Sequence, residues 1–100
     1  MEKAKKNYTL SPKAKNDISI IFDYTVKEFN FDKAVIYTRD FKEVFNSLLF
    51  IPTLGLDRSE IKKGLYSISK NKHVIFYRVF KDSIRIVRVL HGSRDLPKHF

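Results

Sequence analysis

The chain has 100 residues, of which 43% are hydrophobic and 14% aromatic, and it contains no cysteine. This composition predicts one folded domain over residues 1–100 and excludes intrinsic disorder, a disulfide framework, a thiolate nucleophile and a cysteine-ligated zinc site. No apolar run reaches the length of a secretory signal or a membrane span, so we expect a cytoplasmic protein with no membrane partner.

The net charge of +9 is concentrated in the second half of the chain. Residues 1–57 carry nine Lys/Arg and eight Asp/Glu, whereas residues 58–100 carry eleven Lys/Arg and only three Asp/Glu. Such an asymmetry indicates an acidic partner, which is either a nucleic acid or an acidic protein segment. The alternative, that lysines only keep the protein soluble, explains the scattered lysines but not the asymmetry.

The N-terminal half predicts a strand followed by two helices. Residues 7–10 form a short strand pattern, and Ser11-Pro12 is typical of a helix N-cap followed by proline in the first turn. We expect Asn30 to end the first helix and Asp32 to cap the second, which gives an antiparallel helical hairpin. The apolar faces would consist of Ala14, Ile18, Ile21, Phe22, Thr25 and Phe29 in the first helix and of Ala34, Tyr37, Thr38, Phe41, Val44, Phe45 and Leu48 in the second.

Beyond Pro52 and Gly55, which break the helical pattern, the sequence has the character of strands. Residues 65–68, 73–80 and 83–91 are rich in β-branched and aromatic residues and are separated by polar turns. They predict a three-stranded antiparallel meander.

The last of these strands carries apolar side chains on both faces. Ile84, Ile86 and Leu90 alternate with Val87 and Val89, so we expect this strand to be central in the sheet. The order of elements predicts an α+β fold, with the N-terminal strand in the sheet and the helical hairpin on one face of it. The sequence does not indicate which strand of the sheet pairs with the N-terminal strand.

Three histidines, His73, His91 and His99, lack the spacing of a metal site, so we expect no metal and no other cofactor. His91 ends the last predicted strand and could titrate near neutral pH, although a hydrogen-bonded strand-end residue is the more frequent role. A Ser-His-Asp set can be written from Ser93, His91 and Asp95. Three residues so close on one exit turn are poorly placed to act on one substrate atom, so we predict no catalytic residue.

A basic and aromatic group of side chains is the remaining candidate for chemistry. It consists of Tyr66, Tyr77, Arg78, Arg85, Arg88, His91 and Arg94. Arginines beside tyrosines can hold phosphates and stack bases, so an RNA-handling surface is chemically possible. Equally, the tyrosines can belong to the core and the arginines can pair with Glu60, Asp82 and Asp95.

Four segments in order resemble the ParE/RelE superfamily of bacterial toxins of type II toxin–antitoxin systems. They are YTLSPKA (8–14), IPTLG (51–55), HVIFYRV (73–79) and VRVLHGSRD (87–95). The resemblance covers nearly the whole chain and implies the RelE/ParE-like fold. The last segment is most similar to the ParE branch.

The two branches of the superfamily differ in activity. RelE-like members cut messenger RNA in the ribosomal A site with basic residues on the strands after the helices, and the corresponding positions here look like Leu65, Ser67 and Val74. ParE-like members lack that set and poison DNA gyrase by trapping its cleaved-DNA complex. The resemblance therefore favours a non-enzymatic gyrase poison. A RelE-like ribosome-dependent mRNA endoribonuclease and a non-toxic basic binding module are the alternatives.

The resemblance also implies two protein partners. One is a ParD-like antitoxin whose acidic, apolar C-terminal segment silences the toxin, at contact residues that the sequence does not indicate. The other is DNA gyrase, through its A subunit, with indirect contact to DNA. We expect the basic end of the sheet and the tail to bind this target, through Arg85, Arg88, His91, Arg94 and Asp95.

Overall fold

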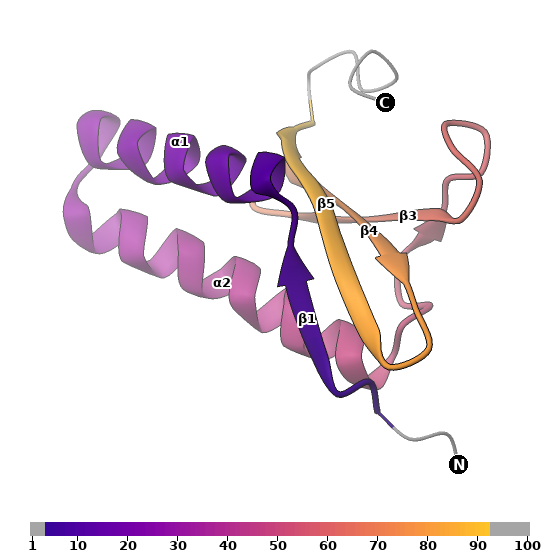
Figure 1. Cartoon of the computed structure of the whole chain (residues 1–100). Coiled ribbons are helices and arrows are strands. Elements are labelled where there is room, and N and C mark those ends of the chain that lie inside the picture. The colour runs from indigo at the N-terminus through magenta and orange to yellow at the C-terminus, as the bar shows by residue number, and fades with distance from the viewer. Residues whose placement is uncertain (1–3, 93–100) are drawn as a thin grey trace.

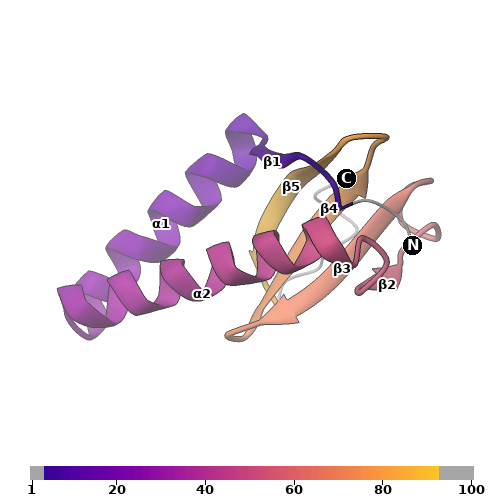
Figure 2. The same ribbon diagram turned by 90° about the horizontal axis from the view of Figure 1, so that it is seen from below.

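The computed structural model describes residues 4–92. They form a five-stranded sheet in the order β1-β5-β4-β3-β2, and a helical hairpin packs against one face of it (Figure 1, Figure 2). The strands are β1 (Asn7–Leu10), β2 (Leu56–Asp57), β3 (Leu65–Lys70), β4 (His73–Val79) and β5 (Ser83–His91), and the helices are α1 (Pro12–Glu28) and α2 (Phe31–Phe50). The predicted α+β fold is confirmed. Among the described residues, neither helix is long and apolar enough to cross a membrane.

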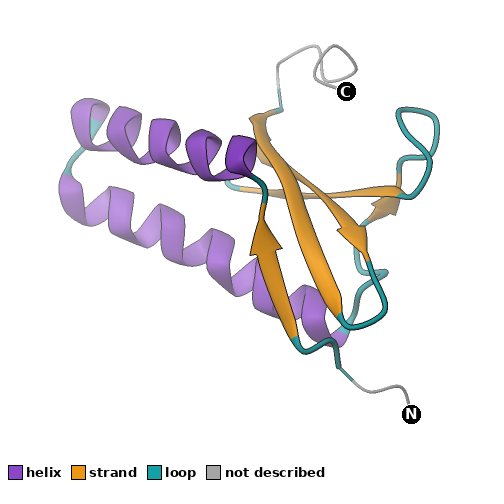
Figure 3. Ribbon diagram, in the orientation of Figure 1, coloured by secondary structure: helices purple, strands orange, loops and turns teal. Residues whose placement is uncertain are grey.

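β5 lies between β1 and β4, so the prediction that it is a central strand is confirmed (Figure 3). β4 pairs with it antiparallel, and β1 pairs with it in parallel. β1 ends at Leu10, opposite Ile86, so the second half of β5 has no strand on that side. The short strand β2 extends the predicted meander at the other edge of the sheet.

The link between the helices differs from the prediction that Asn30 ends α1 and Asp32 caps α2. Asn30 is itself the N-cap of α2, because its Oδ1 accepts a hydrogen bond from the backbone N–H of Lys33 at 2.8 Å. Asp32 lies in the first turn, where its charge favours the positive end of the helix. Phe29, predicted on the buried face, is 64% exposed at this link.

Two apolar clusters lie on the two faces of the sheet. The main core fills the space between the hairpin and the sheet and consists of Ala14, Phe41, Phe45, Leu48, Ile75, Tyr77, Ile84, Ile86 and Val89. The second cluster, Leu65, Phe76 and Leu90, lies on the face opposite the helices. This arrangement explains why the last strands are apolar on both faces.

The register between β4 and β5 passes over Val87, which has no partner on β4. Such a bulge shifts the alternation of side chains by one residue. Val89 therefore continues the face that Ile84 and Ile86 begin, and Leu90 joins the second cluster. The predicted grouping of Leu90 with Ile84 and Ile86 is wrong for this reason.

The free edge of β5 beyond β1 is covered by the start of α1. The Oγ of Ser11, the predicted N-cap, accepts from the N–H of Ala14 at 3.0 Å and donates to the carbonyl of Val87 at 2.7 Å. Further along α1, the carboxylate of Asp17 accepts from the N–H of Val89 at 3.0 Å. The helix thus supplies the hydrogen bonds that a neighbouring strand would otherwise make.

Asp17 also holds Arg88 in a two-point ion pair. The Nε and Nη2 of Arg88 donate to its two carboxylate oxygens at 2.8 and 2.9 Å. Both side chains are largely buried, at 15% exposed for Arg88 and 9% for Asp17, and the hydrogen bond that Arg88 donates to Asp17 raises the pKa of Arg88. The pair therefore fixes α1 against β5 in both position and rotation.

Replacing this carboxylate is expected to destabilise the fold strongly. Asp17→Ala leaves the buried guanidinium and the N–H of Val89 without an acceptor, so the free energy of unfolding should fall by about 3 kcal/mol. Glu60→Ala is the matched control, because its ion pair with Arg58 is exposed and is worth no more than about 1 kcal/mol. Urea unfolding followed by circular dichroism measures both, and equal losses would contradict the assigned role.

Candidate functional site

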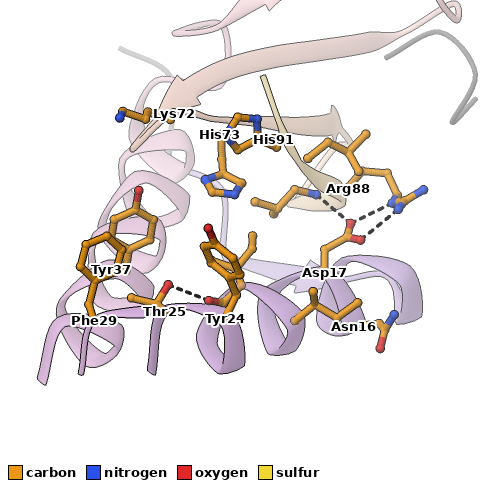
Figure 4. A pocket seen from close by; sticks show the side chains of 14 residues that line it. Asn16, Asp17, Tyr24, Thr25, Phe29, Tyr37, Lys72, His73, Arg88 and His91 are labelled. Atoms are coloured by element: carbon orange, nitrogen blue, oxygen red, sulfur yellow. Dashed lines mark hydrogen bonds and ion pairs between the residues drawn. The ribbon is translucent and has the colours of Figure 1, made fainter. Parts of the chain in front are cut away.

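A groove of about 670 Å³ lies between the helical hairpin and the sheet, where β4 begins and β5 ends (Figure 4). Side chains from α1, the hairpin link, α2 and the two strands converge on it. They are Asn16, Asp17, Ile20, Ile21, Tyr24, Thr25, Phe29, Tyr37, Lys72, His73, Arg88, Val89, Leu90 and His91. The Asp17–Arg88 pair stands at one end of the groove and sets how far α1 lies from β5.

One wall of the groove is apolar and exposed. Ile20 and Tyr24 are one turn apart on α1, and they are 58% and 61% exposed. Neither belongs to the apolar face predicted for this helix. The sequence signal that could have identified them is the four-residue spacing of two large apolar side chains next to the apolar face predicted for this helix. Large apolar side chains that are exposed to solvent along a groove are typical of a surface that binds another protein segment.

The opposite wall is held in place by the turn between β3 and β4. Asn71 and Lys72 have left-handed backbone angles, with φ of 52° and 64°, as a two-residue hairpin turn requires. The hydroxyl of Tyr37 on α2 donates to the carbonyl of Asn71 at 2.9 Å, and the amide of Asn71 donates to Asp40 at 3.2 Å. These bonds join the turn to α2 and place Lys72 and His73 at the groove.

His73 and His91 face each other across β4 and β5. They are register partners, and their rings lie edge to face with centroids 5.3 Å apart. His73 Nδ1 is 2.9 Å from the carbonyl of Asn71, and since a carbonyl only accepts, Nδ1 carries the proton in this bond. Burial lowers the pKa of His73, so the ring is neutral at pH 7. Across residues 4–92, no three His, Cys, Asp or Glu side chains come together as a metal site.

The structure separates the side chains that we predicted to bind a target. Arg88 is engaged with Asp17, and His91 is exposed at the end of β5 beside the groove. Arg85 lies on the other face of the sheet, where its Nη1 donates to Thr9 Oγ1 at 3.2 Å. Arg94 and Asp95 lie outside the described residues.

The aromatic members of the predicted basic and aromatic group belong to the core side of the sheet. Tyr66 and Tyr77 stack with ring centroids 5.5 Å apart. The Tyr77 hydroxyl donates to the carbonyl of Pro52 at 2.8 Å and accepts from the N–H of Gly55 at 3.0 Å, so it anchors the loop after α2. Arg78 lies on the opposite face, with the second cluster, and therefore does not share a surface with the tyrosines.

The positions that the resemblance aligns with RNA-cutting residues lie on this same opposite face. Leu65 is fully buried against Phe76, and Ser67 pairs with Phe76 across β3 and β4. Val74 packs against the same cluster. Leu65 and Ser67 are buried, and none of the three side chains is an acid or a base able to transfer protons at neutral pH.

Comparison with known proteins gives a consistent family assignment. The family model described as "ParE toxin of type II toxin-antitoxin system, parDE" matches residues 8–96. Toxin ParE1 of Mycobacterium tuberculosis (strain CDC 1551 / Oshkosh) is 32% identical over 93 residues, which are 92% of this chain and 95% of that protein. Toxin ParE1 of Caulobacter vibrioides is 30% identical over 94 residues, which are 94% and 97% of the two chains.

A solved structure supports the fold. A chain of the "Chromosomal ParDE TA system from P. aeruginosa" superimposes with a TM-score of 0.73 at 22% identity, over 85% of this chain and 94% of that one. Together with a family match that spans most of the sequence, these similarities establish that the chain belongs to the ParE toxin family of type II toxin–antitoxin systems.

Proposed function

We propose that this toxin poisons DNA gyrase, and that it acts by binding rather than by cutting RNA. The observation that carries the proposal is the chemistry of the positions that the resemblance aligns with RNA-cutting residues. These positions hold Leu65, Ser67 and Val74, of which Leu65 and Ser67 are buried. Metal-free RNA cleavage requires a base and cations around the same phosphate, and none of these three side chains is a cation or a base at neutral pH, so this arrangement favours recognition.

The gyrase-binding surface is the end of β5 together with the residues that follow it. His91 is the exposed side chain at the strand end, and Arg94 and Asp95 follow it three and four residues later in the sequence. Arg88 contributes by positioning α1 through Asp17 rather than by contact with gyrase. Arg85, on the other face, would meet a different part of the gyrase–DNA complex.

The groove is the proposed site of a ParD-like antitoxin. An amphipathic helix placed there would bury Ile20 and Tyr24 under its apolar side, which is the usual way in which a groove binds a helix. Lys72 lies on the opposite wall and would pair with acidic residues of the same helix. The groove therefore suits a segment that is both apolar and acidic.

The gyrase proposal predicts inhibited supercoiling and accumulated cleaved DNA. Purified toxin is incubated with gyrase, relaxed plasmid and ATP, and linear DNA is scored after detergent. Arg94→Glu should abolish both effects, because it reverses the charge of a side chain that contacts the target. The variant should still fold and bind its antitoxin, because Arg94 is proposed to contact only the target. A toxin that leaves gyrase unaffected and cuts translated messenger RNA in the ribosomal A site would establish the alternative function.

The antitoxin proposal predicts that Tyr24→Asp weakens binding of the cognate ParD-like antitoxin at least tenfold. The substitution places a charge where an apolar helix face would be buried, and aromatic side chains commonly dominate such interfaces. Phe50→Asp is the control, because Phe50 is 74% exposed at the far end of α2 and does not line the groove. Titration calorimetry measures both, and a loss of affinity confined to Phe50→Asp would refute the location.

A further inference from the structure

Two arginines stand side by side on the sheet face opposite the helices. Arg78 of β4 and Arg85 of β5 are register partners in an antiparallel pair, so they project from the same face on strands about 4.8 Å apart. Like charges directly opposite each other destabilise a sheet. A pair of this kind in the centre of a sheet therefore calls for an explanation.

No carboxylate among residues 4–92 offsets this pair. The ion pairs in that part of the chain join Arg58 to Glu60 and Arg88 to Asp17. Arg85 instead donates from Nη1 to the hydroxyl of Thr9 on β1, at 3.2 Å. Because a hydroxyl is neutral, this bond does not offset the charge of Arg85.

The two guanidinium groups point in opposite directions across the sheet. Arg85 reaches toward β1, as its bond to Thr9 shows. Arg78 reaches toward the loop before β3, because a Cβ on Gly64 would lie 3.4 Å from its Nη1. The charges therefore spread into a row that runs across the strands.

Arg58 lies on the same face of the sheet, over the ring of Phe76 on β4. Its Nη1 donates to Ser67 Oγ on β3 at 3.2 Å, and its guanidinium lies 5.8 Å from the ring centroid of Phe76. Glu60 contacts its Nε at 3.3 Å from the exposed side. Its position is thus fixed by the sheet before any ligand binds.

We propose that this arginine row, Arg58, Arg78 and Arg85, binds the phosphodiester backbone of a nucleic acid. Guanidinium groups match phosphate oxygens in a two-point geometry, and cations fixed on central strands require little ordering on binding. A backbone carries negative charge at regular intervals, which suits a row better than a single pocket does. The row lies on the opposite face from the groove, so nucleic acid and antitoxin would bind at separate sites.

The test measures DNA binding by the toxin alone, and its outcome is therefore independent of the gyrase proposal. A fluorescent duplex of about 20 base pairs is titrated with toxin at several salt concentrations, and affinity is followed by anisotropy. Arg78→Ala/Arg85→Ala should lower the slope of log affinity against log salt by about 2, since each lost phosphate contact removes about 1. Arg39→Ala/Lys42→Ala removes the same charge from exposed positions on α2 and should leave the slope unchanged.

A folding control and a second nucleic acid probe accompany the titration. Circular dichroism confirms folding, and Arg78→Gln/Arg85→Gln, which keeps the aliphatic stems, replaces the alanine variant if that variant unfolds. A single-stranded oligonucleotide bound with the same arginine dependence supports backbone recognition, and it shows that a duplex is not required. The proposal is overturned by equal slopes for the two alanine pairs, by absence of DNA binding, or by tighter arginine-dependent binding of poly-glutamate than of DNA.

Discussion

The structure depends on one carboxylate placed at a free strand edge. β1 covers β5 only as far as Ile86, and beyond this point α1 takes over the hydrogen bonding. Asp17 is central, because it satisfies the backbone of Val89 and neutralises Arg88 in the same place. A charge this deeply buried is stable only when it is paired and fully hydrogen-bonded, and these three bonds meet that condition. The angle of the hairpin, and hence the groove, follows from this contact.

The sheet then separates two kinds of surface. On the helix side, the groove combines exposed apolar groups with a neutral His73 and the cation of Lys72, which suits a folded peptide segment. On the other face, Arg78 and Arg85 lie beside a small apolar cluster, which suits a polyanion. The two faces of the sheet therefore present different chemistry to the surroundings.

Local patterns predicted the elements well, and long-range contacts were missed. Periodicity and turn residues located both helices, the meander and the Ser11 cap, because these depend on neighbours in sequence. The role of Asp17 was missed, because nothing nearby in the sequence shows that its partner Arg88 lies 71 residues away. The bulge at Val87 was also missed, because a strict alternation of side chains gives no signal for an unpaired residue. Of the predicted target residues, Arg85 and His91 lie on opposite faces of the sheet, and this separation could be seen only in the fold.

Hydrogen exchange at the amide of Val89 tests the central interaction most directly. This amide lies on the side of β5 that has no neighbouring strand, and its acceptor is the side chain of Asp17. In the native protein it should therefore exchange as slowly as the core amides of β4, through global unfolding rather than local opening. Rapid exchange at Val89, with the β4 amides still protected, would show that α1 does not cover this edge of β5. It would contradict the central role assigned to Asp17.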